Sequence, residues 1–526
     1  MPELLYCKTL KDKAIVLAIA AVVSCVLAVG IGYASFLVNG PVSSGTWYNK
    51  YLIMFIAAVL LTVGIFFVFR YELKDKPERA FFAVLLVFTM GSSVMYDVNK
   101  VSWDVESHFR FMLQWTDPDG QVEISGSEYD GMYGYAARVE TSIADLNSWK
   151  AWLNEQDTID TGEVLNNSFT SFYNRLASLP GSLVYMIASV IGLPFVIKYV
   201  LTKLIYSVIF SVVCFLGMRQ LNSGKMIFAA IAMIPSVLFM ASNYSYDYWL
   251  ICFLLYAVAR LVGELQRPEE KLTLKSSLLI FGAFFIGCAP KAVYFPMAAL
   301  ALLMPRQKFN TAAQSRLFRA ACFVVPVLIA SSFLLNFVGS VSEGTNVGDS
   351  RAGSKINSTE QAYFILSDIP GYVLIVINFL LSSYLYAAVH DTAFLAYLNY
   401  PELRTWIVTA FILAFVMLTN KESVDKKYLC TWKTRTWSIV IAVITLGLVI
   451  TSMYVSFTAV GSSSIGGVQP RYAIPILIAF LFFMGSPKLG EIIYVKHKAI
   501  YNTAILGLLT IIPYVILWQT YVSLLH

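Results

Sequence analysis

Residues 14–38 read AIVLAIAAVVSCVLAVGIGYASFLV, a run without a charged side chain. As a helix, such a run can cross the hydrocarbon core of a bilayer, which is about 30 Å thick and takes roughly 20 residues. Comparable apolar runs cover residues 52–69, 318–337, 439–455 and 500–522. Because these runs are continuous rather than alternating, they predict transmembrane helices and not the strands of a barrel. We therefore expect an all-α membrane protein.

The composition of the whole chain points to the same class. Of its 526 residues, 58% are hydrophobic and 13% are charged, and the mean hydropathy is +0.68. Soluble domains carry about 25% charged residues, so most of this surface must face something other than water. The net charge of +6 is spread along the chain, which favours a lipid bilayer as the partner and speaks against nucleic acid.

Short connections rich in Lys and Arg predict the orientation in the membrane. They lie at residues 8–13, 70–79, 306–319, 421–435 and 488–498, and such connections stay on the cytoplasmic side. They can all do so only if an even number of spans separates them. This condition predicts about thirteen spans, with the N-terminus in the cytoplasm and the C-terminus outside. They cover residues 14–38, 51–69, 80–96, 196–218, 226–242, 247–265, 274–289, 291–304, 318–339, 404–420, 436–457, 471–485 and 499–522.

One further apolar segment, residues 372–389, does not fit this alternation. A full crossing there would move the basic connection at 421–435 to the outer side. We expect a re-entrant or membrane-parallel element on the outer side. The alternative is one more span, combined with a shorter segment elsewhere that does not cross.

The longest polar stretch, residues 97–181, holds fourteen acidic residues, five basic residues and many aromatic ones. A disordered linker would not carry so many aromatics. We expect a large extracytoplasmic loop with short amphipathic helices near the membrane surface. A second outer loop is expected within residues 339–400.

Three ionisable side chains lie in the segment WDVESHF, residues 103–109, directly after the third predicted span. On a helix Asp104 and His108 share a face, whereas Glu106 points away. A carboxylate at the membrane boundary can accept a proton from an attacking hydroxyl. The alternatives are an acidic helix start without catalytic function and a metal site, which one His and two acids would support only weakly.

A second candidate is the outer turn SNYSYDYW, residues 242–249, where Asp247 lies among aromatic side chains. An aromatic belt at the membrane boundary explains the Tyr and Trp residues. It does not explain the carboxylate of Asp247.

Four cations lie near the outer ends of predicted helices: Lys198, Lys203, Lys291 and Arg471. A cation beside apolar residues suits the phosphate or pyrophosphate of a lipid-linked molecule, and the guanidinium fork of Arg can bind two phosphate oxygens. Snorkelling to lipid headgroups is the alternative. Lys291 and Arg471 each lie in a turn that contains proline, which favours a function for these two.

The order of these motifs resembles a bacterial family of predicted multi-spanning proteins, domain of unknown function 2142, which looks related to glycosyltransferases of the GT-C fold. The matching residues are Asp104 with His108-Phe109, Ser245-Tyr246-Asp247, Lys291 with Tyr294 and Pro296, and Gly467-Val468-Gln469 with Arg471-Tyr472 and Pro475. The family usually places Glu directly after the Asp, whereas Val105 intervenes here, which leaves a role for Glu106 in doubt.

The resemblance implies a division of the chain into three parts. Two N-terminal spans at 1–79 form an extension, a GT-C-like core covers 80–490 with the outer loops 97–181 and 339–400, and a last span lies within 491–526.

It also implies roles for individual residues. GT-C enzymes take a sugar from a polyprenyl phosphate on the extracytoplasmic side, and an acid of the first large outer loop serves as general base. By position that base is Asp104, with His108 and Glu106 beside it, and transfer inverts the sugar. The implied donor-phosphate ligands are Lys291, Arg471, Lys203, Tyr294, Tyr472 and Gln469, and the implied acceptor-positioning residues are Asp247, Tyr246 and Trp103.

The resemblance thus implies a multi-pass glycosyltransferase of the bacterial plasma membrane that acts on a cell-surface polysaccharide or glycolipid. One alternative is a polysaccharide polymerase or ligase with a polyprenyl-pyrophosphate donor. Another is a flippase or transporter of lipid-linked sugars, which would need polar groups in the middle of the membrane and repeat symmetry. We expect no metal site from protein residues, and a divalent cation is the one cofactor left open.

Overall fold

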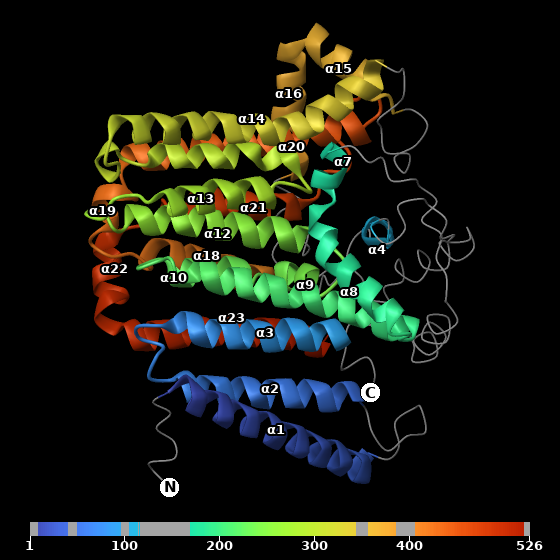
Figure 1. Cartoon of the computed structure of the whole chain (residues 1–526), viewed down its shortest axis with the longest axis vertical. Helices are drawn as coiled ribbons and strands as arrows, with labels where there is room; N and C mark the ends of the chain where they lie inside the picture. The colour runs from blue at the N-terminus through green and yellow to red at the C-terminus, as the bar shows by residue number, and fades with distance from the viewer. Residues whose placement is uncertain are drawn as a thin grey trace.

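The structure is a computed structural model that describes residues 9–39, 50–95, 105–113, 115, 169–342, 356–384 and 405–519. These residues form helices and turns and contain no strand, so the all-α prediction is confirmed for this part of the chain. The long helices lie side by side in a bundle, with α1 at one edge and α14 at the other (Figure 1).

The helices of the described residues are named here in chain order. The first half contains α1 (Leu10–Asn39), α2 (Lys50–Phe69), α3 (Pro77–Met95), α4 (Val105–Leu113), α7 (Phe169–Asn174), η3 (Leu176–Ser178), α8 (Leu179–Val190), α9 (Phe195–Met218), α10 (Lys225–Ala232), α11 (Pro235–Ala241) and α12 (Asp247–Leu265). The second half contains α13 (Leu274–Gly287), η4 (Ala292–Leu303), η5 (Arg306–Lys308), α14 (Ala312–Ser342), α15 (Ser358–Ser367), α16 (Ile369–Phe379), η7 (Leu380–Tyr384), α18 (Thr405–Thr419), α19 (Asp425–Tyr428), α20 (Trp432–Phe457), η8 (Pro470–Ala473), α21 (Ile474–Leu481), α22 (Pro487–Ile493), η9 (Val495–His497) and α23 (Lys498–Leu517).

Eight helices of the described residues are long and apolar enough to cross a membrane, or nine if one bent pair counts as a span. The eight are Lys11–Val38, Tyr51–Phe69, Pro77–Met95, Phe195–Met218, Asp247–Leu265, Ala312–Ser332, Trp432–Phe457 and Pro487–Leu517. The chain is therefore a multi-pass membrane protein. Four other predicted spans, at 274–289, 291–304, 404–420 and 471–485, coincide with shorter apolar helices, and the span predicted at 226–242 is divided between α10 and α11.

Prolines account for two of these shorter elements. The predicted span at 226–242 is two helices, because Pro235 starts α11 after a break at the end of α10. The predicted span at 291–304 is the 3-10 helix η4, which contains Pro296. A proline inside an α-helix removes one backbone hydrogen bond and clashes with the preceding turn. A 3-10 helix rises about 2.0 Å per residue, more than an α-helix, so η4 covers a given length with fewer residues.

The segment predicted to be re-entrant forms part of a bent pair of helices. Residues Ser358–Ser367 and Ile369–Ser382 meet at 107°, and α16 lies across the direction of the bundle helices (Figure 1). Such a bend fits either a broken span or a re-entrant element, so both alternatives drawn from the sequence are compatible with it. Residues 385–389 lie outside the described residues.

The two ends of the bundle differ in character. One end of the bundle carries α19 and α22, the turn between α2 and α3, and the start of α14 (Figure 1). These elements contain the basic connections of the sequence, so we call this end of the bundle the basic end. The opposite end carries α4, α7 and η3 (Figure 1), and we call it the cavity end. The predicted basic connections thus share one end of the bundle.

A buried polar network holds the connections of the basic end together. Asp425 accepts hydrogen bonds from the hydroxyl of Ser223 at 2.5 Å and from the amide of Gln266 at 3.0 Å. These residues precede α10, follow α12 and begin α19, so three distant connections meet at one carboxylate. Since every partner is buried and hydrogen-bonded, we assign this network to stability.

Candidate functional site

The turn between α11 and α12 forms the centre of the site. The hydroxyl of Ser242 donates to the backbone carbonyl of Leu238 at 2.8 Å, and the side-chain amide of Asn243 donates to the backbone carbonyl of Phe239 at 3.1 Å. Polar side chains thus bind the free carbonyls at the end of α11. Asp247 is the first residue of α12, a position where the helix dipole favours an acid. The polar residues of this motif thus stop one helix and place a carboxylate at the start of the next.

Lys291 pairs with Asp247 at the cavity end. Its Nζ donates to Oδ1 of Asp247 at 2.6 Å, and the two side chains are 16% and 8% exposed. The same ammonium lies 5.0 Å from the ring centroid of Tyr246 and 4.4 Å from that of Tyr472. Two aromatic faces and one carboxylate therefore surround a single cation.

The motif around Arg471 comes from η8, more than 170 residues further along the chain. Arg471 is 5% exposed, and its guanidinium carbon lies 5.4 Å from the ring centroid of Tyr472. The hydroxyl of Tyr294 donates to the backbone carbonyl of Tyr472 at 2.8 Å, which ties η8 to η4. Gln469 precedes η8, and its carbonyl accepts from the backbone amide of Tyr472 at 3.0 Å.

His108 reaches the same group from α4. Its ring lies edge-on to that of Tyr246, with centroids 4.2 Å apart and planes at 84°. Four stretches of the chain that are distant in sequence therefore meet here. They contribute His108, Tyr246 with Asp247, Lys291, and Arg471 with Tyr472, all of which the sequence singled out.

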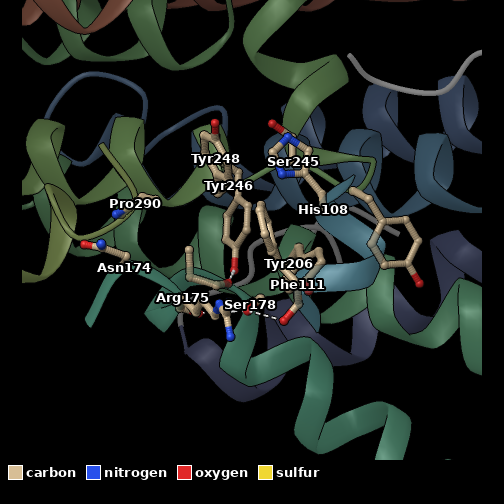
Figure 2. A pocket seen from close by; sticks show the side chains of 12 residues that line it. His108, Phe111, Asn174, Arg175, Ser178, Tyr206, Ser245, Tyr246, Tyr248 and Pro290 are labelled. Carbon is tan, nitrogen blue, oxygen red and sulfur yellow. Dashed lines mark hydrogen bonds between the residues drawn. The ribbon is translucent and has the colours of Figure 1, made fainter. Parts of the chain in front are cut away.

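A cavity of about 270 Å³ opens beside this cluster. Small-molecule sites span about 300–1,000 Å³, so this volume is slightly below their range. Its lining is rich in hydroxyl groups and aromatic rings and includes two basic side chains (Figure 2). The lining residues are His108, Phe111, Asn174, Arg175, Ala177, Ser178, Tyr206, Tyr244, Ser245, Tyr246, Tyr248 and Pro290.

The electrostatics of the cluster favour charged Lys291 and a neutral phenol at Tyr246. Burial raises the pKa of Tyr246 to about 12, and the ammonium of Lys291 only partly offsets this. The short ion pair with the carboxylate of Asp247 favours the charged form of Lys291. Arg471 also acts electrostatically on both groups. The cluster is thus set up to present positive charge.

Other predicted site residues are not placed in this cluster. Trp103 and Asp104 lie outside the described residues, as does the side chain of Glu106. Lys203 is buried on α9, where its Nζ lies 5.3 Å from the ring centroid of Tyr199. In the described part of the chain, no group of three or more His, Cys, Asp or Glu side chains could hold a metal ion.

Several cavity residues were not predicted from the sequence. Arg175 precedes η3 and Ser178 ends it, and the indole of Trp115 donates to Oγ of Ser178 at 3.0 Å. The hydroxyl of Tyr248 donates to the carbonyl of Ala177 at 2.9 Å. Figure 2 shows Arg175 and Ser178 on the side of the cavity away from Ser245. Arg175 was one of only five basic residues in the acidic loop 97–181, a signal that could have marked it.

Comparison with known proteins places the chain in a family. Residues 140–480 match the family described as "Predicted membrane protein (DUF2142)", which is more than half of the chain. The chain belongs to the DUF2142 family. The motifs around Asp247, Lys291 and Arg471 lie inside the matched residues of this DUF2142 protein, whereas Asp104 and His108 precede them. No curated protein and no solved structure matches the chain.

Gly467, the first residue of the matched Gly-Val-Gln motif, has a backbone that favours glycine. Its φ is +75°, and a Cβ atom there would lie 2.5 Å from Cδ1 of Phe457. We expect Gly467→Ala to destabilise the protein by about 1–2 kcal/mol or more, measured as a lower Tm in detergent. Gly447→Ala is the matched control, because nothing lies within 4 Å of a Cβ there. An equal Tm for both variants would contradict the prediction.

Proposed function

We propose that this DUF2142 protein is a GT-C-like glycosyltransferase that takes a sugar from a polyprenyl phosphate. The observation that carries the proposal is the meeting of Lys291 and Arg471 with Asp247 beside a cavity lined by tyrosines. A buried and a partly buried cation at a lipid boundary suit a phosphate group. Tyrosine rings and hydroxyls suit a sugar, since they offer both an apolar face and hydrogen bonds.

The orientation belongs to the same proposal. We take the basic end to face the cytoplasm, because short Lys- and Arg-rich connections stay on that side. The cavity end then faces the outside, and all thirteen predicted segments cross the membrane. A lipid-linked donor in the outer leaflet would bring its phosphate to the depth of Lys291 and Arg471, while its chain stays in lipid.

In the proposed reaction, an acceptor hydroxyl attacks the anomeric carbon, whose bond to the phosphate oxygen breaks. Asp104 takes the hydroxyl proton as general base, and the sugar is transferred with inversion. Polyprenyl phosphate leaves as an anion, so cations can stabilise it without protonation. Asp104 directly precedes α4, whose His108 lines the cavity, and this adjacency supports its role.

The other residues have supporting roles in this proposal. Asp247 keeps Lys291 charged and in place, and Tyr246 and His108 form the wall toward the acceptor. Tyr294 holds Tyr472, and with it the turn that carries Arg471. Lys203, Gln469, Glu106 and Trp103 remain candidates from the sequence.

A polymerase or ligase with a polyprenyl-pyrophosphate donor is the second candidate. Arg175 favours it, because this cation lines the cavity beside the cluster of Lys291 and Arg471 and could serve a second phosphate. Purified protein in vesicles is to be offered a labelled sugar on polyprenyl phosphate or on polyprenyl pyrophosphate, with membranes from cells that lack the protein as acceptor source. We expect transfer from the monophosphate alone. Transfer only from the pyrophosphate would support the second candidate, and transfer from neither would contradict both.

Arg471→Gln is expected to raise the KM for the donor and lower kcat/KM by about 10- to 100-fold. Hydrogen bonds to charged groups contribute about 1.5–3 kcal/mol, and the amide keeps part of the shape but not the charge. The kcat/KM of Arg471→Lys should lie between those of the parent and Arg471→Gln, because lysine keeps the positive charge but lacks the guanidinium fork. Exposed Arg316 at the basic end supplies the control, and Arg316→Gln should leave both constants unchanged. A KM for Arg471→Gln equal to that of the parent would remove Arg471 from the donor site.

A further inference from the structure

A second hollow lies at the basic end, at the opposite end of the bundle from the cavity. It is a groove of about 770 Å³ between α1, α2, α3 and α9. The helices α1 and α2 lie at the edge of the bundle (Figure 1), and Ala14 of α1, which lines the groove, is exposed. The proposed transfer reaction uses none of its residues.

The walls of the groove are apolar. Each of the four helices contributes aliphatic or aromatic side chains, among them Leu17, Ile65, Phe82, Leu86 and Phe215. On α2 the lining runs from Leu61 to Phe69, which corresponds to about 12 Å of helix at 1.5 Å per residue. One leaflet of a hydrocarbon core of about 30 Å is about 15 Å deep. The groove therefore extends over roughly one leaflet.

The mouth of the groove at the basic end is lined by cations. Lys13, Lys76, Arg79 and Arg219 line it together with one acid, Glu78. Lys76 and Arg219 are exposed, and neither forms an ion pair with any residue that the structure describes. These two charges are available to an anion from outside the protein.

Two acids near the mouth, Glu72 and Glu78, have partners within the protein. Glu78 accepts from Nζ of Lys225 at 2.7 Å. Glu72 accepts from Nη1 of Arg79 at 3.0 and 3.1 Å and also pairs with Lys13. Since both acids are neutralised within the protein, the field at the mouth is positive.

We propose that this groove binds a phospholipid with an anionic headgroup from the leaflet at the basic end. Its phosphate lies between Lys76 and Arg219, and an acyl chain follows the apolar walls. A transmembrane helix of a partner protein fits less well, because a spanning helix needs a contact along about 30 Å, whereas this groove covers about 12 Å of α2 and ends in cations. The proposal does not depend on the proposed function.

The test measures lipid retention by the full chain. Purified protein is equilibrated with phosphatidylglycerol and phosphatidylcholine of identical acyl chains, and retained lipids are counted by native mass spectrometry. We expect a preference of about tenfold for phosphatidylglycerol. The double variant Lys76→Gln with Arg219→Gln should abolish this preference, while the control Arg316→Gln with Lys433→Gln, two exposed cations of the basic end outside the groove, should keep it.

A further variant tests the apolar walls. Ala14 is an exposed residue of α1 that lines the groove, so Ala14→Trp should fill it and reduce retention of both lipids at an unchanged Tm. Equal retention of the two lipids by the parent, or full preference in the Lys76 and Arg219 double variant, would overturn the proposal. Displacement by millimolar glycerol phosphate would also overturn it, because an anion site would then suffice without a lipid chain.

Discussion

Replacing Asp104 by Asn is expected to lower sugar transfer by about 10²–10⁴-fold, the contribution that a general base makes in enzymes. The amide has the size of the carboxylate and still accepts hydrogen bonds, but it cannot take the proton of the attacking hydroxyl. Binding of the donor should change little, because Lys291 and Arg471 remain in place. The measurement is the rate of transfer from polyprenyl-phosphate sugar, together with the KM for the donor.

Two controls separate a lost base from a damaged protein. The Asp104→Asn variant should insert into the membrane in the parental amount and keep the parental Tm. Asp104→Glu should retain part of the activity, since a carboxylate remains, displaced by one methylene group. Full activity of Asp104→Asn would remove Asp104 from the mechanism.

Lys291→Met is expected to destabilise the protein by about 3–5 kcal/mol, which is the cost of leaving one partner of a buried ion pair without the other. The pair is short, with 2.6 Å between Nζ of Lys291 and Oδ1 of Asp247, and both side chains are largely buried. The free energy of unfolding in a denaturant titration measures the loss. The rate of sugar transfer should fall together with the stability, because Lys291 also binds the donor phosphate in the proposed function.

A double-mutant cycle separates the two effects. Adding Asp247→Asn to Lys291→Met removes the uncompensated carboxylate, so most of the stability should return while transfer stays low. The pair of Lys498 with Glu422 is the control, with a similar spacing of 2.7 Å but side chains 28% and 24% exposed; Lys498→Met should cost about 1 kcal/mol or less. Recovery of transfer in the double variant would show that Lys291 acts only through stability.

The sequence identified most of the cluster at the cavity end. Asp247, Lys291 and Arg471 were each singled out as a charge at an apolar boundary, and such a charge needs a partner because its burial alone is costly. The sequence could not tell which partner each would take. The pairing of Lys291 with Asp247 depends on how α12, η4 and η8 pack, and no local pattern encodes that.

The cavity wall was harder to predict. Tyr206 lies in the middle of the apolar helix α9, where a tyrosine looks like any other core residue. Arg175 and Ser178 belong to the short elements that end the acidic loop, and their place follows from contacts with Trp115 and Tyr248. Side chains that act through tertiary contact leave no periodic signal in the sequence.

The most direct measurement is an experimental structure of the protein with polyprenyl phosphate, the leaving group of the proposed reaction. The proposed function predicts density for the phosphate within hydrogen-bonding distance of Nζ of Lys291 and the guanidinium of Arg471, with the polyprenyl chain leading away into lipid. Phosphate density at another place in the protein, with Lys291 and Arg471 making no contact to it, would contradict the proposed donor site.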